Sequence, residues 1–155
     1  MLGRVNHIAI AVPDLHSAAE SYRSTLGASV TEPQALPEHG VTVVFVTLAN
    51  TKVELLEPLG EGFLSRFLAK RGEGLHHMTF KTDDIRAAIA HVEGLGYELV
   101  DVSLEDPDWK EAFLRPSRSH GTLIQLAQPS GSDDEAARRL RPSNLDEILA
   151  GEDPT

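Results

Sequence analysis

Four polar side chains occur at matching places in the two halves of this chain, and their types are those that bind metal ions. His7 and His77 each open a predicted strand, while Glu54 and Gln125 each lie within the last predicted strand of their half. Large apolar residues flank Glu54 and Gln125, so these two side chains point away from the apolar face of their strands. A polar group in such a strand is costly unless it has a partner. Two imidazoles, a carboxylate and an amide that converge would bind a hard or borderline divalent ion.

The matching places arise from an internal repeat. Residues 7–15 (HIAIAVPDL) align with residues 77–85 (HMTFKTDDI) at an offset of 70. The offset becomes 71 where residues 53–58 (VELLEP) meet residues 124–129 (IQLAQP). A drift of this size is what loop insertions and deletions produce, so the sequence indicates a duplication.

Each half is predicted to fold in the order β-α-β-β-β. Module one spans 5–58 and module two spans 75–129, within a single domain over 1–129. The elements predicted for module one are strand 5–12, helix 15–26, strand 28–32, strand 41–48 and strand 52–57. Those predicted for module two are strand 75–82, helix 85–95, strand 97–103, strand 110–115 and strand 121–127.

The ends of these elements carry recognisable signals. Asp14 and Asp84 precede the two helices as N-cap residues. Residues 33–40 contain two prolines and a glycine and are predicted to form a loop. Spaced apolar residues over 63–68 predict a short linker helix between the modules. Residues 130–155 are polar and acidic and are predicted to form a flexible tail.

Composition excludes several classes of function. A formal net charge of −10 argues against nucleic-acid binding, because no broad basic face is available to neutralise phosphates. The sequence has no apolar run long enough to span a membrane. The absence of cysteine removes disulfides, thiolate nucleophiles and zinc-finger ligands together. We expect a strand directly after the first residues rather than a signal peptide, and therefore a cytoplasmic protein.

A simpler interpretation of the polar residues stays open. A histidine at the start of a strand is often an ordinary hydrogen-bonded residue, and Glu54 would face solvent if its side of the strand were exposed. His76 points to the opposite side from His77 and is interpreted as structural. The repeat favours the metal site, because chance seldom places polar residues at both pairs of equivalent positions.

The chain resembles the vicinal oxygen chelate (glyoxalase/bleomycin-resistance/dioxygenase) superfamily, and within it the methylmalonyl-CoA epimerases. The resemblance covers residues 5–129 and rests on segments 7–15, 37–41 (PEHGV), 51–58 (TKVELLEP) and 72–77 (GEGLHH). It implies an α+β fold in which two tandem βαβββ modules form a cup-shaped, mostly antiparallel half-barrel sheet around a divalent metal ion. It also implies that His7, Glu54 and His77 are metal ligands, and that the protein forms a homodimer.

The sequence departs from the epimerases near the second half of the site. The epimerases have, at the position of Gln125, a Glu that ligates the metal and acts as catalytic base. A Gln oxygen can still ligate, but an amide cannot take a proton near neutral pH. The His-Pro-Lys of the epimerases is replaced here by Arg115-Pro116-Ser117, and their glycine-rich loop by residues 104–109.

If proton transfer is retained, another group must replace the missing base. The candidates are Glu57, His39, Glu38 or a metal-bound hydroxide. Glu57 has the orientation of the apolar residues on its strand and is expected to cap the strand end. His39 is expected to lie in a solvent-exposed loop.

The resemblance implies an isomerase, a racemase or epimerase, that enolises an acyl-CoA thioester through a metal-bound carbonyl. The metal would be Co²⁺, Mn²⁺, Ni²⁺, Fe²⁺ or Zn²⁺. Because the base position is Gln125, two alternatives stay open. One is a superfamily enzyme of different chemistry, such as a lyase, dioxygenase or tailoring enzyme, whose substrate pocket is shaped by Trp109 and Arg115. The other is a metal- or ligand-binding module without turnover. In an enzyme of this superfamily, Arg115 would bind a substrate carboxylate or phosphate. The alternative interpretation of Arg115 as an ordinary surface arginine stays equally open.

Overall fold

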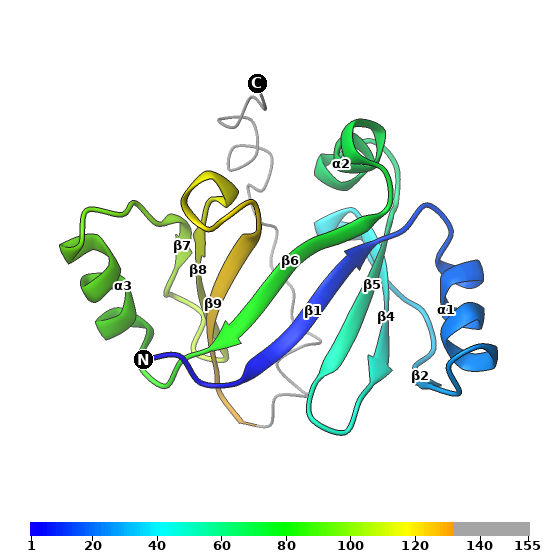
Figure 1. Ribbon diagram of the computed structural model, residues 1–155, viewed down its shortest axis with the longest axis horizontal. Coiled ribbons are helices and arrows are strands. Elements are labelled where there is room, and N and C mark those ends of the chain that lie inside the picture. Colours follow the sequence, from blue (N-terminus) through cyan, green and yellow to red (C-terminus); the bar gives the residue numbers. More distant parts are fainter. Residues whose placement is uncertain (132–155) are drawn as a thin grey trace. The chain divides into compact units, whose positions relative to one another are not determined.

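The structure is a computed structural model that describes residues 1–131. Within these residues the fold is mixed α+β, with three α-helices and nine strands in a mostly antiparallel sheet (Figure 1). The predicted α+β class is confirmed, and the sequence predicts all of these strands except β3. The chain separates into two compact units. We call residues 7–76 the N-terminal unit, and residues 1–6 together with the residues from His77 onward the C-terminal unit.

The N-terminal unit contains most of β1, four further strands and two helices. Its strands are β1 (Val5–Ala11), β2 (Ser29–Val30), β3 (Gln34–Leu36), β4 (Val41–Thr47) and β5 (Lys52–Pro58), and its helices are α1 (Leu15–Ser24) and α2 (Phe63–Arg71). The strand order is β2-β4-β5-β1, with β3 paired to β4. The pairing of β1 with β5 is parallel, and the other pairings are antiparallel.

The C-terminal unit repeats this arrangement. Its elements are β6 (Gly74–Lys81), whose first residues belong to the N-terminal unit, α3 (Ile85–Gly94), β7 (Val100–Ser103), β8 (Trp109–Leu114) and β9 (Leu123–Pro129). The strand order is β6-β9-β8-β7. Again the first and last strands of the module, β6 and β9, are parallel, and the other pairings are antiparallel.

One helix covers one face of the sheet in each unit. In the N-terminal unit, Leu15 and Ala19 of α1 pack against valines of β4 and against Val53 and Leu55 of β5. In the C-terminal unit α3 packs on β8 and β9 through Ile85, Ala88, Ala112 and Leu126. Burying each large aliphatic side chain contributes about 2 kcal/mol to folding. Since neighbouring strand residues face opposite sides, Glu54 of β5 and Gln125 of β9 lie on the face away from the helix.

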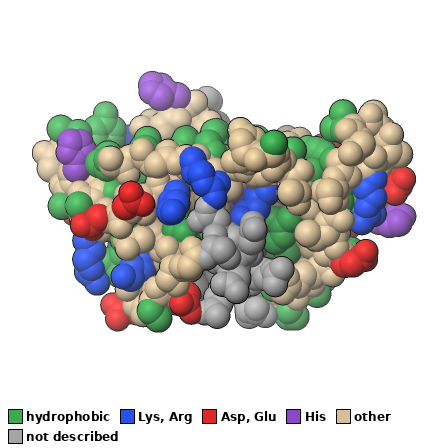
Figure 2. Space-filling view, turned by 90° about the horizontal axis from the view of Figure 1, so that it is seen from below, with side chains coloured by type: hydrophobic (Ala, Val, Ile, Leu, Met, Phe, Trp, Pro, Cys, Tyr) green, Lys and Arg blue, Asp and Glu red, His purple; other side chains and the backbone are tan. Residues whose placement is uncertain are grey.

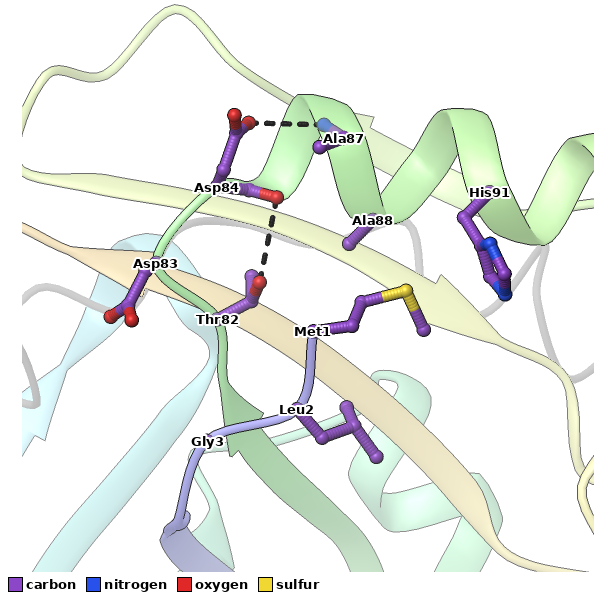
Figure 3. A pocket seen from close by; sticks show the side chains of 9 residues that line it. All are labelled: Met1, Leu2, Gly3, Thr82, Asp83, Asp84, Ala87, Ala88 and His91. Atoms are coloured by element: carbon purple, nitrogen blue, oxygen red, sulfur yellow. Dashed lines mark hydrogen bonds between the residues drawn. The ribbon is translucent and has the colours of Figure 1, made fainter.

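The two predicted N-caps are present and equivalent. The Asp14 carboxylate accepts a hydrogen bond of 2.9 Å from the Ser17 amide. The Asp84 carboxylate accepts one of 3.0 Å from the Ala87 amide (Figure 3). Each bond satisfies one of the amide groups that the first turn of a helix leaves without an intrahelical partner.

A second cap reaches each helix from the last strand of its module. The Leu15 amide donates to Glu57 Oε1 at 3.0 Å, and the Ile85 amide donates to Gln128 Oε1 at 2.9 Å. Glu57 and Gln128 are equivalent in the repeat, at the offset of 71. The last strand therefore carries a helix cap at the same place in both modules.

The sequence prediction was wrong in the segment 33–40. A loop was expected, but β3 pairs with β4 there and a 3-10 helix, Pro37–His39, follows it. A strand of three residues between two prolines is too short to show alternation. β7 also begins at Val100 rather than at residue 97, after Gly96 with a φ of +83°. Residues 132–155, most of the predicted tail, lie outside the described residues.

The surface of the described residues is mixed in character. Figure 2 shows acidic, basic and hydrophobic side chains interspersed on one face, so the net charge of −10 is not gathered there into one acidic patch. None of the helices described within residues 1–131 combines the length and the apolar composition needed to cross a membrane.

The repeated caps give a stability prediction. Substitution Asp84→Ala should lower the free energy of unfolding by about 1 kcal/mol, because the Ala87 amide loses its acceptor. The neighbouring exposed Asp83 lines the same end of α3 without a cap bond, so Asp83→Ala is the matched control and should change stability much less. Urea denaturation followed by circular dichroism measures both. Equal losses in the two variants would contradict the assignment of Asp84 as the cap.

Candidate metal centre

His7 and Glu54 come together in the N-terminal unit, on the sheet face opposite α1. The parallel register of β1 and β5 pairs Ala9 with Glu54, which brings His7 to the same face two residues earlier. His7 is 1% exposed and Glu54 is fully buried. His7 Nε2 lies 3.4 Å from Glu54 Oε2. Neither carboxyl oxygen of Glu54 accepts a hydrogen bond from the described residues.

Burial decides the protonation of this pair. It lowers the pKa of His7 to about 3, and the positive charge of Lys52 adds to the lowering. It raises the pKa of Glu54 to about 8, although Lys52 acts in the opposite direction there. Without a bound cation both side chains are therefore mainly neutral at pH 7, and their contact is not an ion pair.

The pair meets the requirements of a divalent cation. Ligand atoms bonded at about 2.1 Å to one ion are about 3.0–3.4 Å apart, and the observed separation lies at the upper end of this range. A neutral imidazole and a carboxylate are common ligands of transition metals. A cation would also bind the buried carboxyl oxygens of Glu54, which accept no hydrogen bond from the described residues.

Sequence reasoning missed Lys52, which lies beside this pair. Lys52 is on β5 two residues before Glu54, so it faces the same side, and it is 8% exposed. Its ammonium group is 6.0 Å from the centroid of the Phe45 ring. The alternation of β5 was the available signal, since it places Lys52 and Glu54 together. Its positive charge favours the ionised form of Glu54.

In the C-terminal unit, His77 and Gln125 occupy the face away from α3. His77 lies near the middle of β6 and is 5% exposed, while Gln125 on β9 is 2% exposed. Thr79, two residues after His77, is opposite Gln125 in the strand register. The Thr79 hydroxyl donates to Gln125 Oε1 at 2.5 Å. The predicted orientation of Gln125, away from the apolar face, is confirmed because Ile124 and Leu126 pack on the α3 side.

Gln125 is also tied to a buried carboxylate that sequence reasoning missed. Gln125 Nε2 donates to Glu111 Oε2 at 2.5 Å. The same oxygen accepts the indole N–H of Trp109 at 2.7 Å. Glu111 and Trp109 are 4% and 1% exposed. A charged residue in a strand usually faces solvent, so the sequence alone does not indicate that Glu111 is buried. The pairing of β8 with β9 brings Glu111 close to Gln125.

The remaining candidates are distributed over other parts of the chain. Glu57 is on the α1 side of β5, opposite to the face of Glu54, and binds the Leu15 amide. His39 is only 9% exposed, so the expectation of a solvent-exposed residue was wrong; the 3-10 helix packs it inward. Arg115 is half-buried directly after β8. The side chain of Glu38 lies outside the described part of the chain.

His76 has a structural role, as the sequence predicts. Its ring packs edge-on against Phe67 of α2, with centroids 4.9 Å apart, and it also lies near Phe63. Burial lowers its pKa to about 4, with a further contribution from Arg71. His76 is therefore a neutral aromatic side chain in the packing between β6 and α2.

A cavity of about 530 Å³ lies elsewhere in the C-terminal unit, at the N-terminal end of α3 (Figure 3). It is lined by Met1, Leu2, Gly3, Thr82, Asp83, Asp84, Ala87, Ala88 and His91. None of the predicted site residues is among them. Within the C-terminal unit, His77 and Gln125 lie on the other face of the sheet, away from α3.

Comparison with known proteins gives consistent results. A protein-family model described as the Glyoxalase/Bleomycin resistance protein/Dioxygenase superfamily matches residues 6–113. The chain is 46% identical over 133 residues to an ethylmalonyl-CoA/methylmalonyl-CoA epimerase of Cereibacter sphaeroides, covering 83% of this chain and 99% of that protein. It is 44% identical over 131 residues to the mitochondrial methylmalonyl-CoA epimerase of Homo sapiens, covering 82% of this chain and 74% of the human one.

A solved structure shares the fold. A variant of the Streptomyces coelicolor methylmalonyl-CoA epimerase, in complex with 2-nitronate-propionyl-CoA, superposes with a TM-score of 0.74 at 31% identity. The match covers 84% of this chain and 97% of that one. The resemblance inferred from the sequence motifs is thereby confirmed at the level of both sequence and fold.

The raised pKa of Glu54 gives a pH-dependent prediction for the metal-free protein. An acid whose pKa is about 8 when folded and near 4.5 when unfolded makes folding less favourable as the pH rises between these values. Substitution Glu54→Gln removes this loss, so the variant should gain stability over the wild type as the pH rises. The full gain should be on the order of several kcal/mol, since each pKa unit corresponds to about 1.4 kcal/mol.

Urea denaturation in the presence of EDTA between pH 6.5 and 8.5 tests this prediction. His7, whose pKa falls from 6.5 to about 3 on folding, is partly protonated in the unfolded chain near pH 6.5. Because His7 is present in both proteins, its contribution cancels in the difference between the wild type and the Glu54→Gln variant. Glu57→Gln is the matched control, because it makes the same replacement on the same strand at a carboxylate that has a hydrogen-bond donor, the Leu15 amide. A Glu54→Gln variant less stable than the wild type at pH 8 would contradict the placement of an unpartnered carboxyl group there.

Proposed function

Because this chain belongs to the Glyoxalase/Bleomycin resistance protein/Dioxygenase superfamily, we propose that it is a metal-dependent isomerase that epimerises methylmalonyl-CoA or a similar 2-carboxyacyl-CoA. One observation carries this proposal, the 46% identity to the Cereibacter sphaeroides epimerase over 99% of that protein's length. The name of that relative includes ethylmalonyl-CoA, so the side chain on the α-carbon of the substrate has one or two carbons.

We assign the metal site to His7, Glu54 and His77, with Gln125 as the fourth protein ligand. The first three are buried and could together hold a metal ion. The Glu54 carboxyl oxygens, which have no donor among the described residues, favour this assignment. Gln125 Oε1 receives one hydrogen bond from Thr79, which leaves a lone pair for a cation. The ion would be one of Co²⁺, Mn²⁺, Ni²⁺, Fe²⁺ and Zn²⁺, all of which accept this set of donors.

The proposed chemistry is removal and return of the α-proton of the acyl-CoA. A bound divalent ion supplies a Lewis acid for the negative charge that develops on the thioester oxygen. His7 would bind the metal ion as a neutral imidazole, and its lowered pKa keeps it in this form at pH 7. Inversion also needs a base on one face of the α-carbon and an acid on the other. Gln125 can serve as neither, because an amide does not exchange a proton at neutral pH.

Two further residues are proposed to act on the substrate side. Arg115, half-buried after β8, would bind a carboxylate or phosphate of the acyl-CoA through its planar guanidinium group. The indole of Trp109 is buried and donates to Glu111. We therefore propose that Trp109 shapes the site through Glu111 rather than by contact with the substrate.

The proposal also includes a homodimer and a cytoplasmic location. Light scattering after gel filtration tests whether the protein is a dimer.

The first test is exchange of the α-proton of methylmalonyl-CoA. Proton NMR in D₂O should show loss of the α-proton signal with the protein and Co²⁺, and little loss when EDTA is present. Substitution His77→Ala should lower the rate by at least 100-fold if His77 is a ligand, since the site loses a donor. Stoichiometric Co²⁺ binding without any exchange would overturn the epimerase proposal and point to a superfamily enzyme of different chemistry, or to a binding module without turnover.

Glu57 caps helix α1, so we do not expect it to be the base in the proton-transfer step. Substitution Glu57→Gln keeps an acceptor for the Leu15 amide, as Gln128 does for Ile85 in the other module. The exchange rate should therefore stay within about threefold of the wild type, and stability should fall by about 0.3–1 kcal/mol from the lost charge at the helix N-terminus. A 100-fold loss of exchange in a folded variant would instead make Glu57 the base.

A further inference from the structure

The buried network around Gln125 supports an inference that rests on the proposed metal site and extends it. We propose that Glu111 is a positioning residue for the metal ligand Gln125. Through one hydrogen bond it fixes the orientation of the Gln125 amide and provides the negative charge that an amide ligand lacks. The carboxylate that the epimerases have in the last strand is in this chain one strand away, on β8.

The first step of the argument is the hydrogen-bond geometry. Glu111 Oε2 accepts from Gln125 Nε2 at 2.5 Å and from Trp109 Nε1 at 2.7 Å. Gln125 Oε1 accepts from the Thr79 hydroxyl at 2.5 Å. These four side chains are all 4% exposed or less. The short distances and the burial make this a rigid chain of donors and acceptors.

The second step is the orientation of the amide. A carboxylate accepts hydrogen bonds and cannot donate them, so Gln125 must present its NH₂ group to Glu111. The amide oxygen is then turned to the opposite side, toward Thr79 on β6. β6 is also the strand of His77, two residues earlier on the same face. Glu111 therefore selects the one orientation in which Gln125 offers an oxygen on the side of the proposed ligand His77.

The third step concerns charge. An amide whose N–H donates to a carboxylate is polarised, and its oxygen becomes a stronger donor to a cation. Two N–H donors to Glu111 Oε2 favour its ionised form, in which Glu111 and Gln125 together carry one negative charge, as a single Glu ligand would. A Glu at position 125 would lie against Glu111 with two carboxylates at hydrogen-bond distance, which is unfavourable unless one is protonated. Gln125 and Glu111 are therefore matched to each other.

The test measures Co²⁺ affinity by isothermal titration calorimetry at pH 7.5. Substitution Glu111→Gln keeps the size of the side chain and removes the charge, and it should weaken Co²⁺ binding by about 10–100-fold. Glu98→Gln, which removes an exposed carboxylate of the same unit, is the matched control and should bind as the wild type does. Equal affinity of the two variants would overturn the inference.

A second measurement needs neither metal nor substrate. In the metal-free protein, the Gln125 side-chain NH₂ resonances should be shifted downfield by the bond to the Glu111 carboxylate. They should move upfield in Glu111→Gln, whose neutral oxygen is a weaker acceptor, and should stay in place in Glu98→Gln. Resonances that do not respond to Glu111→Gln would overturn the proposed coupling.

A double variant, Glu111→Gln with Gln125→Glu, exchanges the two side chains and completes the test. The double variant again has one carboxylate and one amide, so it should recover Co²⁺ affinity to within about fivefold of the wild type. A purely structural role of Glu111 predicts no recovery.

If Glu111→Gln does not fold, Trp109→Phe provides a second test, because it keeps an aromatic ring and loses the hydrogen bond from the indole. It should weaken Co²⁺ binding by a smaller factor than Glu111→Gln. Absence of Co²⁺ binding by the wild type would overturn the proposed function as well, while wild-type binding with no effect of these variants would overturn this inference alone.

Discussion

The burial of one carboxyl group, that of Glu54, is the constraint on which the rest of this structure depends. A fully buried carboxyl group without a hydrogen-bond donor opposes folding, so the surrounding elements must supply the free energy that holds it in place. They do so through the apolar face of the same strand, where Val53 and Leu55 pack under α1. The parallel register of β1 and β5 then places His7 beside Glu54. The metal ion proposed above would return part of this free energy on binding, and the stability of the protein would then depend on metal concentration.

The two modules use the same scaffold with different charge. Each last strand carries a polar residue toward the candidate site and another toward the start of its helix, and in both places a Glu of the first module is a Gln of the second. In the first module the carboxylate itself faces the site. In the second the carboxylate of Glu111 is one strand further away and acts on Gln125 through a hydrogen bond. Duplication thus preserved the backbone while the positions of the acids diverged.

Much of the fold and part of the site follow from the sequence, for identifiable reasons. Alternation along β5 and β9 is a local property, so the orientation of Glu54 and Gln125 could be predicted, as could the Asp14 and Asp84 caps. Glu111 could not be predicted, since its partner is fourteen residues away on another strand and depends on the β8–β9 register. The same holds for β3, which exists only because β4 offers it an edge.

The spacing of the two polar residues on the last strands limits which insertions and deletions the gene can accept. Glu54 and Glu57 are an odd number of positions apart, so a single strand sends one side chain to the candidate site and the other to the cap of α1. One added or deleted residue between them would turn one of the two to the wrong face. The same spacing separates Gln125 from Gln128. The offset between the halves is constant at 71 along these strands, and its changes all fall before them. Length variation among relatives of this chain should therefore lie outside these strands.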